Sequence, residues 1–170
     1  MKTLIVIDVQ NDFVTGSLGT PEAQAIIPNV RKKIAEYRER KDKIIFTQDT
    51  HDSNYLETSE GKYLPVSHCI AGTDGWKIVD ELSNDEDIIV YKSTFGNLYW
   101  SKLVSQRDDT IEIIGLCTDI CVISNALILK AMFPNSKITV DASCCAGVTP
   151  ETHKSAIEVM KICQIDIIGE

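Results

Sequence analysis

Six short runs of hydrophobic residues recur along the chain, and polar residues separate them. The runs occupy residues 2–8, 43–48, 88–91, 111–116, 137–140 and 163–168. Their length and their content of Ile and Val are typical of buried strands. Between the first two runs, residues 23–40 place hydrophobic side chains at helical spacing, with charged residues between them. Further helices are expected at residues 98–104, from 118 to 132, and at 150–161.

Strands that alternate with helices predict a parallel sheet covered by helices on both faces. We therefore expect an α/β fold of the three-layer, doubly wound (Rossmann-like) class with a six-stranded parallel sheet. The 170 residues and the hydrophobic content of 44% suffice for one domain with a sizeable core. No repeat or low-complexity tract divides the chain, so residues 1–170 are interpreted as a single domain.

Residues 49–77 have no sustained period and are interpreted as a long loop. They contain two of the three histidines, a proline and three glycines. Loops of this length inside a compact domain are usually functional. This segment is therefore a candidate part of a site.

The acidic composition limits the classes of partner. A net charge of -8 and a pI near 4.9 argue against binding to nucleic acid or to an anionic membrane surface. Small molecules are the expected partners. Residues 120–133 form the longest hydrophobic segment, but it is too short to span a bilayer and carries Ser124, Asn125 and Lys130. The N-terminal hydrophobic run is interrupted at Asp8 and does not resemble a secretion signal, so a cytoplasmic location is expected.

The stretch from residue 115 to residue 122 joins the fourth strand to a long helix. Thr118 or Asp119 is expected to cap that helix and to place Cys121 in its first turn. Unpaired backbone amides and the helix dipole favour an anion there, so the thiol should ionise easily. A thiolate is a strong nucleophile, and Cys121 is therefore the candidate for covalent catalysis.

The six cysteines are expected to be reduced, since no secretory signal is seen. Cys117 and Cys121 are four residues apart and can share one helix face, which also fits a pair of metal ligands. The interpretation that we favour is one reactive thiol, Cys121, and one packed residue, Cys117.

Polar residues of complementary chemistry follow several of the predicted strands: Asp8, Asp49, Lys92 and Cys121. In a doubly wound sheet the ligand lies beyond the carboxyl ends of the strands, where the winding direction reverses. Burial would raise the pKa of Asp8 and make it a candidate general base. Lys92 would stabilise both the carboxylate and the thiolate. The alternatives are a carboxylate that caps a loop and a lysine that is merely solvated at a strand end.

Asp49 and His51 lie on the same side of an extended segment, because alternate residues share a face. With His68 they make one carboxylate and two imidazoles, a set that suits zinc, manganese or iron. The alternative is that these histidines form surface hydrogen bonds, which is the interpretation that we give to His153.

Five segments of the chain, taken together, resemble one enzyme family. The segments are Asp8-Val9-Gln10-Asn11-Asp12-Phe13, Asp49-Thr50-His51, His68 to Gly75, Lys92-Ser93-Thr94, and Gly115 to Val122. In this order they are similar to the isochorismatase-like cysteine hydrolases, which include the nicotinamidases. Each segment alone is weakly specific, but five in register over nearly the whole chain are highly specific.

The resemblance implies a catalytic triad of Asp8, Lys92 and Cys121 that cleaves a small-molecule amide through an acyl-enzyme and releases ammonia. It also implies a cis peptide before Cys117, with the backbone amides of Cys117 and Cys121 directed at the oxyanion. A divalent metal, zinc or alternatively manganese or iron, would be held by Asp49, His51 and His68. In nicotinamidases this metal anchors the ring nitrogen of the substrate, and an aromatic residue at the position of Phe13 contacts that ring.

The chain departs from nicotinamidases where they carry Trp-Pro before the second metal histidine. Leu64-Pro65 stands here instead, so the sequence leaves the identity of the amide open. Tyr55 and Tyr63 are candidates to replace the missing ring, and Tyr55 and Gln10 join Phe13 as expected substrate contacts. The retained Cys121 argues against vinyl-ether hydrolysis, because isochorismatases proper lack this cysteine.

Three other functions stay open at this point. The first is hydrolysis of a carbamoyl or ureido amide, and the second is binding of a small molecule without catalysis. The third is thiol redox chemistry that uses Cys121 with Cys117 or with the pair Cys144-Cys145. Residues 98–100 and Phe133 are interpreted as either core or a homo-oligomer interface.

Overall fold

The computed structural model describes residues 2–105 and 110–170. Within these residues, parallel strands form one six-stranded sheet in the order β3-β2-β1-β4-β5-β6. The strands are β1 Lys2–Ile7, β2 Lys43–Asp49, β3 Ile88–Lys92, β4 Thr110–Leu116, β5 Lys137–Ala146 and β6 Asp166–Ile168. The predicted α/β fold with an all-parallel sheet is therefore confirmed, although β5 is longer and β6 shorter than expected.

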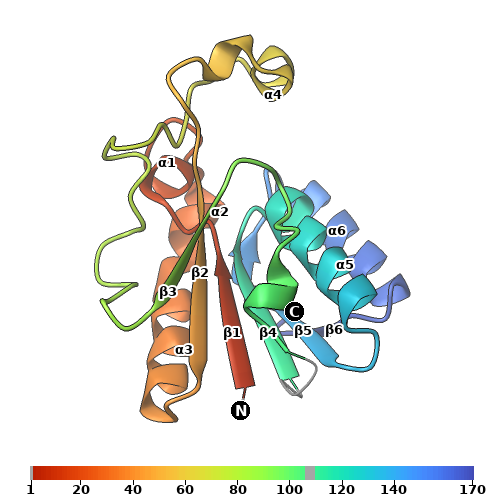
Figure 1. Ribbon diagram of the computed structural model, residues 1–170. Coiled ribbons are helices and arrows are strands. Elements are labelled where there is room, and N and C mark those ends of the chain that lie inside the picture. The colour runs from red at the N-terminus through yellow and green to blue at the C-terminus, as the bar shows by residue number, and fades with distance from the viewer. Residues whose placement is uncertain (1, 106–109) are drawn as a thin grey trace.

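Helices cover both faces of the sheet (Figure 1). Helix α3 (Ile27–Glu39) lies on one face, and α5 (Ile123–Met132) and α6 (Pro150–Ile162) lie on the other. Side chains of β1 alternate between the two layers, as strand geometry requires: Leu4 and Val6 belong to the core on the α3 side, and Ile5 and Ile7 to the core on the α5 side. This burial on both sides explains why β1 reads as an uninterrupted hydrophobic run.

The winding direction reverses between β1 and β4. From β1 the chain continues outwards to β2 and β3, and it then returns to β4 before it continues to β5 and β6 on the other side. The carboxyl ends of β1 and β4 are therefore where loops diverge and leave a crevice. Gly115 lets these two strands approach closely. Its φ is +121°, and a Cβ atom at this position would lie 2.1 Å from the backbone oxygen of Ile7.

The helix expected over residues 23–40 is interrupted. Helix α2 (Pro21–Ala25) ends before Ile26, and α3 begins at Ile27 with Pro28 in its first turn. Proline has no N–H with which to continue the hydrogen-bonding pattern of the preceding helix, so the two helices separate here.

Two segments between the main elements also differ from expectation. Residues 98–104 form only a single 3-10 turn, η2 (Trp100–Lys102), in place of a helix. The segment 49–77 is largely irregular, as expected, but it contains η1 (Tyr55–Glu57) and α4 (Ser59–Tyr63). Helix α4 projects above the sheet at the end where the strands terminate (Figure 1). The short helix α1 (Asn11–Val14) follows β1 at the same end.

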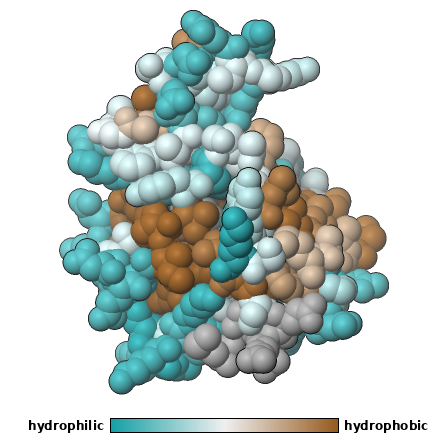
Figure 2. Space-filling view, viewed as in Figure 1, coloured by the Kyte–Doolittle hydropathy of each residue, from teal (hydrophilic) through white to brown (hydrophobic). Residues whose placement is uncertain are grey.

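Exposed hydrophobic residues gather on one face of the molecule. Figure 2 shows them over the edge strand β3 and over α5. Trp100 and Phe133 belong to the core, whereas Leu98 and Tyr99 are exposed. No helix in the described ranges combines the length and the hydrophobic character needed to cross a membrane.

Candidate active site

Three residues from distant parts of the sequence meet at the carboxyl edge of the sheet. Asp8 follows β1, Lys92 ends β3 and Cys121 follows β4. The Lys92 Nζ lies 2.5 Å from Asp8 Oδ2 and 3.6 Å from Cys121 Sγ. All three residues are buried, so their charges interact in a medium of low polarity.

The backbone of Asp8 is left-handed, with φ +47°, a conformation that Asp tolerates better than most residues. The hydroxyl of Thr47 donates a hydrogen bond to the Asp8 carboxylate at 2.6 Å. The oxygen of that hydroxyl also accepts a hydrogen bond from the backbone N–H of Asp8 at 3.1 Å. Burial raises the pKa of Asp8 even though Lys92 opposes this shift. Asp8 is therefore suited to take up a proton at a higher pH than an exposed aspartate.

Lys92 is shared by two carboxylates. Besides Asp8, its Nζ contacts Asp49 Oδ1 at 3.1 Å. Burial by itself would lower the pKa of the Lys92 ammonium, but the carboxylates of Asp8 and Asp49, together with the neighbouring Cys121 sulfur, raise it above its ordinary value. Lys92 therefore remains a cation and is not itself a proton acceptor near neutral pH.

Cys121 lies in a turn of π-helix, η3 (Thr118–Val122), that follows a cis peptide between Leu116 and Cys117. The prediction that Thr118 or Asp119 caps this helix is wrong. Thr118 Oγ1 lies 2.7 Å from His153 Nδ1, and the Asp119 carboxylate accepts from the backbone N–H of Val148 at 3.1 Å. Both side chains therefore fasten the turn to the β5–α6 side of the molecule. His153 is thus not the merely surface residue that the sequence indicated.

The prediction that the Cys121 thiol ionises easily is also wrong for the protein without substrate. Burial, together with the negative charge of Asp8, raises its pKa well above the usual range, and Lys92 offsets only part of this. Thiolate must therefore form by transfer of the proton to a neighbouring group rather than by loss to water. Asp8, whose pKa is also raised, is the neighbour with the right chemistry.

Next to these residues lies a buried set of candidate metal ligands. Donor atoms of Asp49, His51 and His68 all lie within 4.8 Å of one another. His68 Nδ1 is hydrogen-bonded to the backbone oxygen of Val66 at 2.8 Å, which leaves Nε2 directed at Asp49 Oδ2, 3.7 Å away. One carboxylate and two imidazoles, with the second nitrogen of His68 occupied by a carbonyl, fit a zinc, manganese or iron ion.

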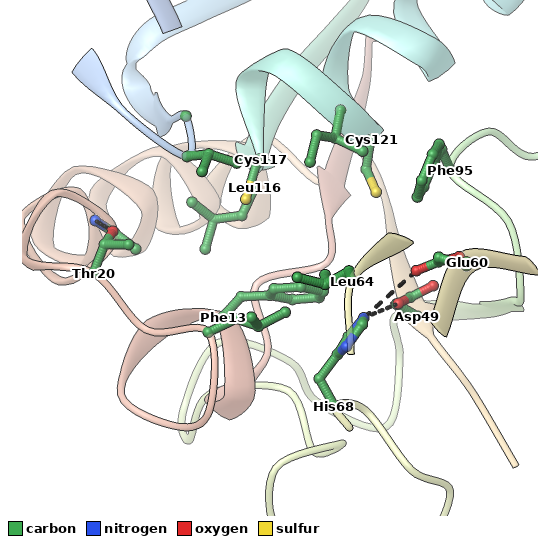
Figure 3. A pocket seen from close by; sticks show the side chains of 15 residues that line it. Phe13, Thr20, Asp49, Glu60, Leu64, His68, Phe95, Leu116, Cys117 and Cys121 are labelled. Carbon is green, nitrogen blue, oxygen red and sulfur yellow. Dashed lines mark hydrogen bonds and ion pairs between the residues drawn. The ribbon is translucent and has the colours of Figure 1, made fainter. Parts of the chain in front are cut away.

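Sequence reasoning missed a further carboxylate beside this set of candidate ligands. Glu60 Oε1, from α4, lies 3.8 Å from His51 Nε2. It also lies 3.7 Å from His68 Nε2, a contact drawn in Figure 3. Its only signal in the sequence was a carboxylate between the two histidines, in a segment that also contains Asp52 and Glu57. The sequence alone could not select among them.

A cavity of about 130 Å³ connects the metal ligands with Cys121. Its wall includes Phe13 and Leu64, and the ring of Phe13 lies 5.5 Å from that of His68 (Figure 3). Phe95, which the sequence did not single out, forms the wall beside Cys121. The volume suits a small molecule, since it corresponds to roughly ten water molecules at 10–15 Å³ each.

Gln10 and Tyr55, expected as substrate contacts, are not among the residues that line this cavity. The side-chain amide of Gln10 is hydrogen-bonded to backbone groups. Its Nε2 donates to Asp49 O at 2.9 Å, and its Oε1 accepts from Asp49 N at 2.7 Å. Tyr55 is buried behind the metal ligands, with its ring 4.7 Å from that of His51. Both residues therefore contact candidate metal ligands rather than the cavity. Tyr63 is 90% exposed and does not replace the missing aromatic wall.

The six cysteines, all within the described residues, are free. Cys117 lines the cavity beside Cys121, whereas Cys144 and Cys145 are buried in β5. Among the described residues, the group with metal-binding geometry is Asp49, His51 and His68, and it does not include Cys117 and Cys121.

Comparison with known proteins identifies relatives over nearly the whole length. The model of the isochorismatase domain matches residues 2–169. The nicotinamidase/pyrazinamidase of Mycobacterium tuberculosis is 25% identical over 186 residues, which cover 99% of this chain and 98% of that protein. The pyrazinamidase of Pyrococcus horikoshii in complex with zinc has a TM-score of 0.85 and 28% identity, with 99% of each chain covered. The N-carbamoylsarcosine amidase of Thermoplasma acidophilum has a TM-score of 0.80 and 25% identity, with 99% of this chain and 96% of that chain covered.

Proposed function

Because the chain belongs to the isochorismatase family, we propose that this hydrolase is a cysteine-dependent amidohydrolase that releases ammonia from a small, nicotinamide-like amide. The observation that carries the proposal is the buried contact of Lys92 with both Asp8 and the Cys121 sulfur, at 2.5 and 3.6 Å. A base, a cation and a nucleophile at these distances are the parts that covalent amide hydrolysis needs.

In the proposed mechanism Asp8 first takes the proton from the Cys121 thiol, and Lys92 stabilises the thiolate that results. The sulfur attacks the carbonyl carbon, and the negative charge moves to the carbonyl oxygen, which accepts hydrogen bonds from the backbone amides of Cys117 and Cys121. Asp8 then gives its proton to the amide nitrogen as the C–N bond breaks and ammonia leaves.

The remaining thioester is cleaved by water. Asp8, again a carboxylate, takes a proton from the water as its oxygen attacks the carbonyl carbon. The C–S bond breaks, the thiolate is protonated by Asp8, and a carboxylic acid is released. Lys92 keeps its proton throughout, since the charges around it raise its pKa.

Asp49, His51 and His68, with Glu60 beside them, would hold the metal. We propose zinc, which agrees with the zinc complex of the P. horikoshii pyrazinamidase, with manganese and iron as alternatives. When bound, such an ion supplies a Lewis-acid anchor for a lone pair of the substrate. Phe13 and Leu64 then pack against the body of the substrate and exclude water from it.

The walls of the cavity favour an uncharged acyl group. They are mainly hydrophobic, and the charged residues among those that line the cavity are the carboxylates Asp49 and Glu60. A substrate with its own carboxylate would meet repulsion from both. A carbamoyl or ureido amide is the second candidate, supported by the similarity to N-carbamoylsarcosine amidase. A substrate of this class that also carries a carboxylate would have to bind with that group directed away from Asp49 and Glu60.

The test is ammonia release from a panel of amides: nicotinamide, pyrazinamide, and carbamoyl and ureido compounds. We expect the wild type to hydrolyse an uncharged aromatic amide, and Cys121→Ala and Asp8→Asn to lose at least about 1,000-fold in kcat. Cys163→Ala is the matched control, because Cys163 lies at the end of α6 and does not line the cavity. Equal release by the wild type and both active-site variants contradicts the mechanism.

The same preparation separates the other functions. Ligand binding that persists in Cys121→Ala, without ammonia release by the wild type, indicates a non-catalytic binder. A disulfide that cycles with peroxide and dithiothreitol indicates a redox protein. A cytoplasmic location and self-association are further parts of the proposal, and fractionation of cells and light scattering test them.

A further inference from the structure

The side chain of Asn125 is fully buried in α5, one helical turn after the nucleophile. Its Oδ1 accepts hydrogen bonds from the backbone N–H of Asn97 at 2.8 Å and from Trp100 Nε1 at 3.0 Å. Its Nδ2 donates to the backbone oxygens of Phe95, at 3.0 Å, and Cys121, at 2.8 Å. Two acceptor sites and two donors are the full capacity of an amide side chain, so every one is used.

These four bonds join two segments that carry the site. One is the turn that positions Cys121. The other is the segment after Lys92, which contains Phe95 in the cavity wall and Trp100 in the core. A single NH₂ group thus fixes how far the backbone of the nucleophile lies from the backbone of the Phe95 wall. The core residue Trp100 anchors the arrangement through the opposite atom of the same amide.

We propose that Asn125 is a positioning residue that sets both the reactivity of Cys121 and the fit of the substrate against Phe95. It acts through its bond to Cys121 O on the chemical step and through its bond to Phe95 O on substrate binding. The two roles are separable, because each uses a different hydrogen atom of the NH₂ group. The inference rests on the proposed amidohydrolase function for its kinetic consequences, but not for its structural ones.

Two substitutions of Asn125 separate its role in the chemical step from its role in substrate binding. Asn125→Asp preserves the shape and the acceptors for Asn97 and Trp100; as a carboxylate it removes both donors, and as a carboxylic acid it keeps one of the two. Asn125→Thr loses the amide's bonds to Phe95, Asn97 and Trp100, yet a threonine hydroxyl in a helix donates to the carbonyl four residues earlier, which here belongs to Cys121. We therefore expect Asn125→Thr to restore the chemical role alone.

The first experiment measures kcat and KM on the most rapidly hydrolysed amide. We expect Asn125→Asp to lower kcat on the order of 10- to 100-fold, the effect of a misplaced reacting group, and to raise KM. Asn125→Thr should keep kcat within about threefold of the wild type and still raise KM. In a Phe95→Ala background the KM effect of Asn125→Thr should disappear, since the wall that it positions is gone.

Asn97→Asp is the matched control. It introduces the same carboxylate in the neighbouring segment, while Asn97 Nδ2 has no hydrogen-bond partner among the described residues. Its backbone N–H still bonds to Asn125, and its side-chain oxygen still accepts from Tyr99 N at 3.0 Å. We expect kcat and KM of this variant to stay within about threefold of the wild type. A loss as large as that of Asn125→Asp would mean that charge, not position, is responsible.

The second experiment needs no substrate. The rate at which iodoacetamide alkylates Cys121, followed by peptide mass spectrometry, reports thiolate that Lys92 stabilises. We expect it to fall at least about threefold in Asn125→Asp and to stay at the wild-type value in Asn125→Thr. If the wild type releases no ammonia, the proposed function fails while this result still decides the role of Asn125.

Circular dichroism at the assay temperature establishes that each variant is folded. If Asn125→Asp does not fold, comparison of Asn125→Thr with the wild type still tests the two roles of Asn125. A raised KM with retained kcat and an unchanged alkylation rate then supports the inference. Equal loss of kcat in the Thr and Asp variants overturns the inference, as does wild-type behaviour of Asn125→Asp in both experiments.

Discussion

Replacement of Lys92 by methionine tests the electrostatic centre of the site. Methionine keeps an unbranched side chain of similar length but removes the ammonium that lies 2.5 Å from Asp8 and 3.1 Å from Asp49. Both carboxylates are buried, and Asp8 is left with Thr47 as its hydrogen-bond partner. Removal of one partner from a buried ion pair costs about 3–5 kcal/mol, a large part of the stability of a typical domain.

The stability that Lys92→Met loses should depend on pH, and the protonation of Asp8 determines whether the loss grows or shrinks as pH rises. Burial raises the pKa of Asp8, and Lys92 counteracts this shift. Without Lys92 the pKa of folded Asp8 rises further above its unfolded value, so the folded variant holds a proton that the unfolded chain has released. The stability of such a state falls as pH increases. The difference in unfolding free energy between the wild type and Lys92→Met should therefore widen from pH 5 to pH 8.

Urea unfolding at both pH values measures this difference, and ammonia release at pH 7.5 measures the catalytic effect, for which we expect at least about a 100-fold loss. Lys137→Met is the control, because it removes an exposed pair with Asp166 at 3.4 Å and should cost no more than about 1 kcal/mol. A deficit for Lys92→Met no larger than that of the control, or one that narrows as pH rises, would refute the reasoning.

Three further changes have defined outcomes. Gly115→Ala would place a Cβ 2.1 Å from Ile7 O at φ +121°, and we expect thermal unfolding to show a loss of more than about 3 kcal/mol and a failure to bring β1 and β4 into register. Glu60→Gln should weaken zinc binding at least about tenfold in isothermal titration calorimetry, since it removes a charged oxygen from the edge of the metal set; unchanged affinity would exclude Glu60 from the site. Burial lowers the pKa of His153, so the unfolded chain binds the proton more readily, and the stability from its contact with Thr118 should be lost as pH falls from 7.5 to 5; His153→Leu should lack this part of the pH dependence in urea unfolding.

The sequence was sufficient to predict the parallel sheet and to predict that residues far apart in the chain lie at one edge of it. Hydrophobic runs such as residues 2–8 are long enough for strands and too short for helices, and the carboxyl ends of parallel strands share one edge. Asp8 and Lys92 were therefore expected at the same edge of the sheet, and the strand order of the structure, with β2 alone between β1 and β3, brings them into contact. The resemblance to a family implied roles for individual residues, which spacing alone does not indicate, and these roles stay predictions.

What the sequence did not predict depends on tertiary burial. The pKa of Cys121 depends on the atoms around the thiol, and local position at the start of a helix indicated the opposite direction. Threonine is a residue type that often caps helices, but the hydroxyl of Thr118 instead forms a hydrogen bond with His153, 35 residues away. Asn125 looked like a polar interruption of a hydrophobic helix, and only its four partners show why an amide stands there.

The sharing of Lys92 between Asp8 and Asp49 has a consequence for protein engineering. In the proposed mechanism Asp8 transfers protons and Asp49 holds the metal ion, and the ammonium of Lys92 contacts both carboxylates. Exchange of Asp49 for a different donor, to accept another metal, would also alter the protonation of Asp8. Asp8 and Asp49 therefore cannot be redesigned independently, and a change of chemistry at one has to be matched by a change at the other.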